Sequence, residues 1–255
     1  MSNLDHFLYW NNAANTLDFQ GRSPESGEML HAYTRRNMFG IEPEKRIHRI
    51  FQRDFLQSDM MHNRITLPVA SAGSWLDPLE NPLANVSGLD EVSGACIDYG
   101  ALVRSFHALC WTQRERARPS DWTSFSHGNP AIRITTTAGK LMQRLVSRDD
   151  SGYMHRTWLV NIEYVESDRI EAMQNLAEVV RRMESTGTLL VLTAAMVRTT
   201  FQDESEVRLL YDTSLSPLPP GVTLDLSSGL VQIPLVRIPF DWADFIENSE
   251  DGPSC

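Results

Sequence analysis

The spacing of apolar residues along the chain predicts many short strands and a few helices. Alternation every second residue, or a short apolar run, predicts strands at Met29–Thr34, Ile65–Val69, Ala101–Thr112, Ala131–Thr137, Thr157–Val165, Val222–Leu226 and Val231–Ile238. Helical spacing predicts helices at Glu42–Ser58, Ala138–Arg148 and 168–184, and one helical turn at Pro119–Phe125. The apolar segment Leu189–Val197 fits a buried helix or a buried strand equally well.

The order of these elements favours an α+β fold, because strands outnumber helices and do not alternate with them as in a βαβ series. We expect one domain over residues 1–255, with two small, mostly antiparallel sheets, flanking helices and a cleft between the sheets. Residues 84–100 carry Gly88, Gly94 and Gly100 and are expected to form a surface excursion. Residues 1–28, expected as loop or short helix, and the polar tail 247–255 are expected to be peripheral.

Two glutamates begin a late apolar segment, in Phe201-Gln-Asp-Glu204-Ser-Glu206-Val-Arg208-Leu-Leu-Tyr211. On an extended backbone alternate side chains share a face, so Glu204, Glu206 and Arg208 are expected to point the same way. Neighbouring carboxylates repel each other unless a cation lies beside them, which makes this pair a candidate for charge chemistry. The alternative is an edge strand with a solvated polar face.

Charge and cysteine content narrow the classes of partner. The formal net charge of −10 argues against general attraction to nucleic acid or to an anionic membrane, although Arg114, Arg116 and Arg118 could form a local basic groove. The three cysteines show neither metal-ligand spacing nor the even count of a disulfide framework, so we predict no metal site. The chain opens without a signal-peptide pattern and its apolar runs are short, so we expect a cytoplasmic protein that does not enter the membrane.

Several common catalytic signatures are missing from the sequence. There is no glycine-rich phosphate loop before a helix, no His-Glu-x-x-His and no Gly-x-Ser-x-Gly, which argues against Rossmann oxidoreductases, P-loop nucleotidases, zincins and α/β-hydrolases. The remaining candidates are His31 and Tyr33 on the first predicted strand, Trp111 and Thr112 at the end of a middle strand, and the two glutamates.

Two of these segments resemble the ADP-ribosyltransferase fold. Leu30-His31-Ala-Tyr33-Thr34-Arg-Arg-Asn37 resembles the His-x-Thr…Asn-Leu opening of nucleic-acid-modifying bacterial toxins of that family, and Ser205-Glu206-Val-Arg-Leu-Leu210 is similar to their Ala-Glu-apolar strand. Glu204-x-Glu206 also has the Glu/Gln-x-Glu form of arginine- and nucleotide-modifying members.

This resemblance implies an enzyme that uses NAD as its substrate. It implies that Glu206 stabilises the oxocarbenium-like transition state and that Glu204 binds or deprotonates the acceptor. It also implies that His31 bonds the adenosine-side ribose, while Tyr33 or Trp111 stacks on nicotinamide and Thr112 lines the nicotinamide side.

A second resemblance extends over most of the chain. The segments that carry it are, in order, Trp75-Leu-Asp77-Pro78-Leu-Glu80, Cys110-Trp111-Thr112, Trp122-x-x-Phe125, Phe201-x-x-Glu204-x-Glu206-x-Arg208 and Trp242-Ala-x-Phe245-Ile246. Together they resemble a widespread bacterial domain of unknown function. Leu76 stands where that domain usually has Asn, and Val207 where it usually has an aromatic residue.

The two resemblances together suggest a divergent transferase that moves ADP-ribose from NAD to a macromolecule. They imply an intracellular toxin or phage-defence effector, with nucleic acid slightly favoured over protein as the acceptor and with an antitoxin or regulatory protein as a further partner. The alternative is an inactive interaction module of the same fold, in which Glu204 and Glu206 pair with arginines. A nuclease or another hydrolase is a third class.

Overall fold

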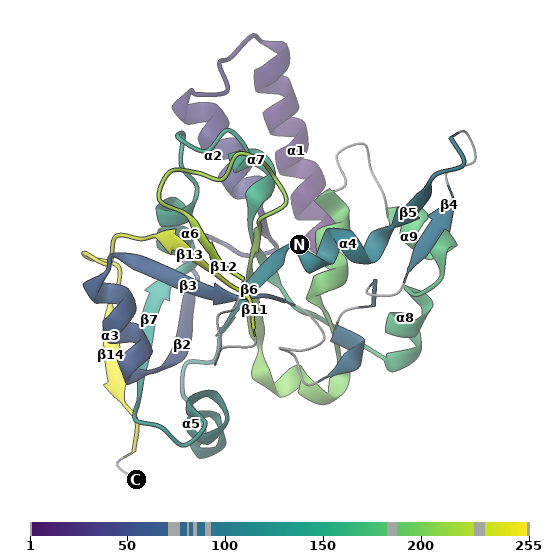
Figure 1. Ribbon diagram of the computed structural model, residues 1–255. Helices are drawn as coiled ribbons and strands as arrows, with labels where there is room; N and C mark the ends of the chain where they lie inside the picture. Colours follow the sequence, from purple (N-terminus) through teal and green to yellow (C-terminus); the bar gives the residue numbers. More distant parts are fainter. Residues whose placement is uncertain are drawn as a thin grey trace.

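The structure is a computed structural model that describes residues 2–70, 77–80, 82–83, 86–89, 93–182, 188–226 and 233–253. Its helices are α1 (Asn3–Phe19), α2 (Gly27–Arg36), α3 (Arg53–Met61), α4 (Tyr99–Arg104), α5 (Pro119–Ser126), α6 (Ala138–Leu145), α7 (Tyr153–Arg156), α8 (Ser167–Ala172) and α9 (Leu176–Arg182), with 3-10 turns η1 (Pro78–Glu80), η2 (Thr188–Ala195) and η3 (Thr199–Glu204) (Figure 1). Its strands are β1 (Met38–Phe39), β2 (Arg46–Gln52), β3 (Arg64–Pro68), β4 (Ser87–Leu89), β5 (Cys96–Asp98), β6 (Phe106–Thr112), β7 (Ala131–Thr137), β8 (Thr157–Asn161), β9 (Glu163–Val165), β10 (Met196–Arg198), β11 (Glu206–Asp212), β12 (Thr223–Asp225), β13 (Leu235–Pro239) and β14 (Asn248–Asp251).

The largest sheet has seven strands in the order β1-β8-β11-β6-β2-β7-β14. Neighbouring strands within this sheet are antiparallel, except that β1 and β8 are parallel. Strand β6 pairs with β11, and β2 with β7, along their whole lengths. Between β6 and β2, however, only His48 and Thr112 are paired. The sheet therefore consists of two halves that join at one residue pair, which we call the seam.

Arg49 strengthens the seam from the side of β2. Its Nη1 donates a hydrogen bond to the carbonyl oxygen of Cys110 on β6, and its guanidinium lies 4.9 Å from the ring centre of Phe51. A backbone carbonyl at this depth needs a donor, and a side chain supplies it where the strand ladder is interrupted.

Three smaller sheets complete the described structure. Strands β12, β13 and β3 form an antiparallel sheet, β9 and β10 a parallel pair, and β4 and β5 an antiparallel pair. The predicted α+β organisation is confirmed. The expected pair of small sheets is wrong, because a single seven-stranded sheet, interrupted at the seam, dominates the fold.

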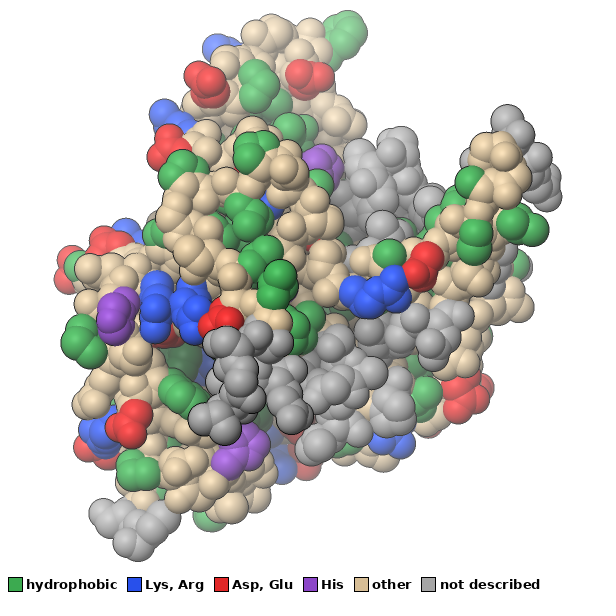
Figure 2. Space-filling model, in the orientation of Figure 1, with side chains coloured by type: hydrophobic (Ala, Val, Ile, Leu, Met, Phe, Trp, Pro, Cys, Tyr) green, Lys and Arg blue, Asp and Glu red, His purple; other side chains and the backbone are tan. Residues whose placement is uncertain are grey.

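Both ends of the described chain are more ordered than expected. Residues 3–19 form the long helix α1, which pairs with α2 at the top of Figure 1 and stacks Phe7 on Phe39 with ring centres 5.5 Å apart. Strand β14 adds an edge to the main sheet beside β7, although the tail was expected to be peripheral. On the face shown in Figure 2, basic and acidic side chains are interspersed and form no broad patch of either sign.

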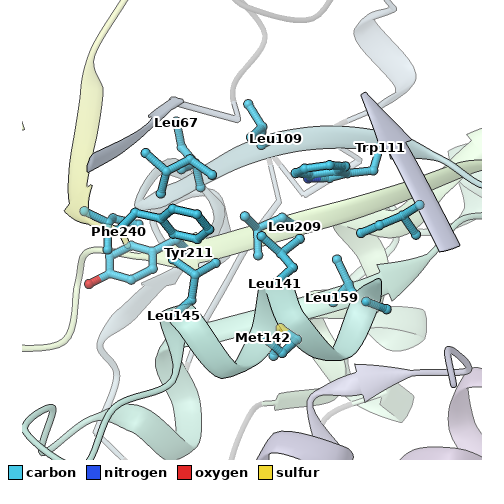
Figure 3. Packing of buried hydrophobic residues seen from close by; sticks show 14 of the residues in the cluster. Leu67, Leu109, Trp111, Leu141, Met142, Leu145, Leu159, Leu209, Tyr211 and Phe240 are labelled. Carbon is cyan, nitrogen blue, oxygen red and sulfur yellow. The ribbon is translucent and has the colours of Figure 1, made fainter. Parts of the chain in front are cut away.

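The main core lies between the large sheet, α6 and the segment after β13. Figure 3 shows Trp111, Leu209 and Tyr211 of the sheet beside Leu141 and Leu145 of α6. The aromatic segment 240–246 closes this core, since Phe240, Trp242 and Phe245 are buried against one another and against Phe51 and Trp111.

Two predicted elements have the wrong type. Residues 29–34 belong to helix α2 rather than a strand: Ser26 caps the helix by accepting from Met29 N–H, and Met29, Ala32 and Arg36 are buried at helical spacing. Residues 42–58 are strand β2 followed by α3 rather than one helix. Strand β2 is buried on both faces, so its apolar residues imitate a helical pattern.

Other predictions hold with shifted or divided bounds. The strands at 65–69 and 131–137, the turn at 119–125 and the helix at 138–148 correspond to β3, β7, α5 and α6. Residues 157–165 divide into β8 and β9, 101–112 into α4 and β6, and the described part of 168–184 into α8 and α9. Residues 189–197 are a 3-10 turn followed by β10, residues 84–100 contain the β4–β5 pair, and the last two predicted strands appear as β12 and β13, with 231–232 outside the described residues.

Candidate functional site

A cavity of about 310 Å³ lies over the seam. Its walls come from β2, β6 and β11, the segment 113–118, helix α5, and the turns η1 and η3. The carboxylates Asp77, Glu80, Asp121, Glu204 and Glu206 line it together with the arginines Arg49, Arg114, Arg116, Arg133 and Arg208. Carboxylate and guanidinium groups are therefore equal in number around the same small volume.

A row of polar residues crosses four strands at the floor of this cavity. Thr135 of β7 pairs with His48 of β2, His48 with Thr112 of β6, and Thr112 with Glu206 of β11. Residues directly opposite each other on neighbouring strands place their side chains on the same face of a sheet. His48, Thr112 and Glu206 accordingly all line the cavity. We call these four residues the polar row.

Glu206 is held in a buried ion pair. Its Oε1 accepts from Arg208 Nε at 2.9 Å, and its backbone N–H donates to Tyr164 Oη at 2.7 Å. Arg208 also donates from Nη1 to the Ala194 carbonyl and from Nη2 to Glu80 Oε2. Burial alone would lower the pKa of Arg208, but the carboxylates of Glu206 and Glu80 outweigh it and raise that pKa above its ordinary range. Arg208 thus stays charged and fixes both carboxylates.

The carboxyl group of Glu204 has different surroundings, although it is only two residues from Glu206. Its carboxylate has no hydrogen bond to another described residue. Burial, followed by the negative charges of Glu206 and Glu80, raises the pKa of Glu204 from 4.5 to about 7. A carboxyl group with this pKa exchanges a proton near neutral pH, as a general acid or base requires.

The backbone conformation of Ser205 places the two glutamates in these different surroundings. Ser205 adopts the left-handed conformation (φ 46°, ψ 48°) and ends the turn η3, so Glu204 precedes strand β11 instead of lying on it. The expectation of one extended face carrying Glu204, Glu206 and Arg208 is therefore wrong for Glu204. Thr112 fixes this turn, because its Oγ1 donates to the Glu204 carbonyl at 2.6 Å.

The wall beyond Glu80 is held by a second ion pair. Asp77 is 5% exposed and its Oδ2 accepts from Arg198 Nε at 2.7 Å, while the guanidinium of Arg198 lies 5.5 Å from the ring centre of Phe201. Asp77, Glu80, Phe201, Glu204, Glu206 and Arg208 all belong to the second sequence resemblance, and the structure brings them around one cavity. Trp75 and Leu76 of that pattern lie outside the described residues.

The three arginines predicted as a basic groove are mostly engaged within the fold. Arg114 pairs with Asp121 at 2.6 Å and also bonds the Asp203 carbonyl, and Arg118 pairs with Asp203 at 3.1 Å. Arg116 is exposed, lines the cavity and has no ion pair to another described residue. The cluster therefore offers one uncommitted guanidinium rather than three.

The predicted cofactor residues divide between several places. Thr112 lines the cavity beside the glutamates, but His31 and Tyr33 are not among the lining residues. His31 and Tyr33 both belong to helix α2. The ring of His31 lies edge-on to Trp10, and the ring of Tyr33 lies edge-on to Tyr153. Trp111 is 2% exposed and its ring packs edge-on against Phe51 and Phe245, although the residue is also among those that line the cavity. Strand alternation directs the side chains of Thr112 and Trp111 to opposite sides of the sheet.

The sequence reading missed two residues of the cavity. His48 was assigned to a helix and Arg133 to the polar side of a strand without a role. Arg133 is 6% exposed and donates to the carbonyls of Arg114 and Glu115, so it holds the segment above the cavity. The segment Ile47-His48-Arg49-Ile50-Phe51 does not alternate strictly, so its pattern gave no local signal that would separate a strand buried on both faces from a helix.

Within the part of the chain that the structure describes, no group of three His, Cys, Asp or Glu side chains is placed to bind a metal ion. None of the described helices combines the length and apolar character needed to cross a bilayer. No protein-family model, curated protein or solved structure gives a significant match to the chain.

Proposed function

We propose that the cavity binds NAD and that the protein transfers ADP-ribose from it to an acceptor. The observation that carries this proposal is the opposed state of two neighbouring carboxylates: Glu206 is ion-paired, whereas Glu204 has a pKa of about 7. Pairs of carboxyl groups whose environments separate their pKa values are typical of enzymes that break glycosidic bonds. The proposal keeps the roles that the resemblance implies, with Glu204 as the proton acceptor and Glu206 as the fixed charge.

In the proposed reaction the bond between nicotinamide and ribose breaks, and its electron pair neutralises the positive ring nitrogen of nicotinamide. The ribose becomes oxocarbenium-like, and the negative charge of Glu206, Glu80 and Glu204 opposes the developing positive charge. An acceptor hydroxyl then forms the new bond to the ribose carbon and gives its proton to Glu204. Arg116 is the guanidinium available for the diphosphate of NAD.

The acceptor and the biological role follow from the resemblance stated above. We propose a macromolecular acceptor and a role as a toxin or defence effector, with an antitoxin or regulator as a further partner. We propose Arg116 as the arginine of this cluster that contacts a nucleic-acid acceptor, because Arg114 and Arg118 are paired with aspartates.

A second candidate function is favoured by the pairing of Glu206 with Arg208. A carboxylate that already accepts a hydrogen bond from a guanidinium of 1% exposure is also what an inactive module with a structural ion pair would contain. Under this candidate the cavity serves as a binding surface and no bond is broken.

Nicotinamide release from labelled NAD, measured with a cell lysate as the source of acceptor, tests the two candidates. We expect release by the wild-type chain and a roughly 10²-fold or larger loss in Glu204→Gln, which removes the proton acceptor but keeps the shape. Glu163→Gln, which changes an exposed carboxylate paired with Arg169 outside the cavity, serves as the control. Full activity of Glu204→Gln contradicts the assignment of the proton acceptor.

Stability and nicotinamide release, measured together on Glu206→Gln, separate the candidates further. Glu80 still contacts Arg208 in this variant, but the buried guanidinium loses the charge of one of its two carboxylate partners, so we expect the free energy of unfolding to fall by about 3 kcal/mol. An enzyme loses both stability and nicotinamide release in this variant. An inactive module loses stability alone, and its wild-type chain releases no nicotinamide.

A further inference from the structure

We infer that His48, two strands away from Glu206 along the polar row, forms a subsite for the amide edge of a planar heteroaromatic ring. This inference rests on the proposed function, because it assigns the nicotinamide half of NAD to one end of the same cavity. It also stands as a binding property that can be measured without any reaction.

The geometry of His48 points to a missing partner. The side chain is 3% exposed and its Nδ1 lies 2.8 Å from Thr135 Oγ1. Its Nε2 has no hydrogen-bond partner among the described residues, and Glu115 Oε2 lies 3.7 Å away. A buried polar atom without a partner is costly, and His48 lines the cavity, so a ligand group there would satisfy it.

The surroundings of His48 suit an aromatic ring. Ile50 follows it on the same face of β2, and Ala117 and Phe125 line the same cavity from the 113–118 segment and α5. Helix α5 packs directly on β2, which places these apolar groups over the strand that carries His48. Apolar side chains beside a few placed polar groups are the usual surroundings of a flat ring, and this end of the cavity supplies such apolar side chains.

The charge state of His48 selects an amide. Burial, assisted by the positive charge of Arg133, lowers the pKa of His48 to about 4, so the imidazole is neutral at pH 7. In a neutral imidazole Nε2 either donates or accepts, according to the tautomer. A carboxamide presents both an N–H and a C=O on one edge and can therefore pair with either tautomer.

The distance from His48 to Glu206 along the polar row matches the length of a nucleoside. His48 and Glu206 are each paired with Thr112, so they lie two strand spacings apart, or about 10 Å between their backbones. A nicotinamide riboside bridges this interval when its amide meets His48 Nε2 and its sugar lies beside Glu204 and Glu206.

Titration with nicotinamide alone tests the subsite. We expect saturable binding to the full chain and a roughly fivefold to tenfold weaker affinity in His48→Leu, which is the loss of one hydrogen bond. His48→Gln retains a polar amide at that position and should recover most of the affinity. The matched control is His107→Leu: His107 is equally buried, its Nε2 also lacks a partner, and it does not line the cavity. Its affinity for nicotinamide should stay within twofold of wild type.

The outcomes separate this inference from the proposed function. Nicotinamide that binds with the expected His48 dependence, in a protein that does not consume NAD, supports the subsite and overturns the proposed reaction. Consumption of NAD together with nicotinamide affinity that is unchanged in His48→Leu overturns the subsite and leaves the reaction standing. Absence of any saturable nicotinamide binding to the wild-type chain also overturns the subsite. If His48→Leu fails to fold, His48→Ala takes its place, and an affinity of that variant for nicotinamide equal to that of wild type overturns the inference.

Discussion

Ser205 determines what each of the two glutamates beside it can do. Its left-handed backbone directs Glu206 into the sheet, where Arg208 holds it, and leaves Glu204 on the preceding turn, where it forms no ion pair with another described residue. Two identical side chains two residues apart consequently have different surroundings, and burial raises the pKa of Glu204 to about 7. The difference arises because Glu204 is partly buried, whereas the guanidinium of Arg208 is bonded to Glu206 and Glu80.

The raised pKa of Glu204 has a consequence for stability that is independent of catalysis. Its pKa is about 7 in the folded chain and 4.5 ordinarily, so between these values the folded chain holds a proton that the unfolded chain has released. Ionisation of Glu204 therefore lowers the free energy of unfolding as the pH rises from 4.5 to 7. Replacing Glu204 by Gln should raise that free energy by about 1–2 kcal/mol at pH 8 and by no more than about 0.5 kcal/mol at pH 4.5.

Urea unfolding at the two pH values measures this difference. The Glu163→Gln control, which alters an exposed carboxylate, should stay within about 0.5 kcal/mol of wild type at both. A Glu204→Gln variant that gains the same stability at pH 4.5 and pH 8 would show that Glu204 titrates normally.

The seam is the feature that matters at the level of secondary structure. The two halves of the sheet share one backbone pair, so side chains carry much of the connection. Arg49 contributes its bond to the Cys110 carbonyl and its contact with Phe51, and it is the residue of β2 that reaches across to β6.

Replacement of Arg49 by Leu should weaken the seam. The Cys110 carbonyl then loses its donor, and we expect the free energy of unfolding to fall by about 2 kcal/mol. Amide hydrogen exchange should accelerate in β2 and β6 in particular. Arg46→Leu is the matched control on the same strand, because Arg46 is 62% exposed and lies 3.8 Å from Glu247. Equal losses in the two variants would mean that Arg49 does not support the seam.

Across the whole molecule, charge opposes tight association with nucleic acid. The chain carries a formal net charge of −10, Arg114 and Arg118 are neutralised by Asp121 and Asp203, and Figure 2 shows the two signs interspersed on one face. In the absence of NAD we expect single-stranded RNA or DNA to bind more weakly than about 10⁻⁴ M at physiological salt.

Fluorescence anisotropy with a labelled oligonucleotide, repeated at several salt concentrations, measures this affinity. Micromolar binding that weakens steeply with salt would reveal a basic surface that the arginine pairs do not neutralise. Arg116→Ala should change the affinity little, since one guanidinium contacts one phosphate.

The sequence predicted the composition of the fold better than its connections. Strands with clear alternation, such as 131–137, were found because only one period fits them. Residues 46–52 were not, since a strand buried on both faces has apolar residues at spacings that a helix also shows. Because these residues were predicted as a helix, His48 was not predicted as a residue of the site. The seam could not be predicted, because pairing between distant strands leaves no local pattern.

The candidate site was predicted in part for a similar reason. Glu204, Glu206 and Thr112 were recognised from local sequence and do meet at one cavity. His31 and Tyr33 were selected by a pattern that assumed an extended chain, and the cap at Ser26 makes that segment a helix. Which face of a sheet a strand residue occupies depends on a single step of register, and the sequence alone does not determine which face borders a cavity.

The single pair at the seam gives a bound molecule a mechanical role. A ligand that reaches from His48 to Glu206 crosses the one place where the sheet is nearly divided, and its own covalent bonds then act as a brace between the two halves. We therefore expect an occupied cavity to make the seam more rigid than an empty one, so that occupancy and rigidity rise together.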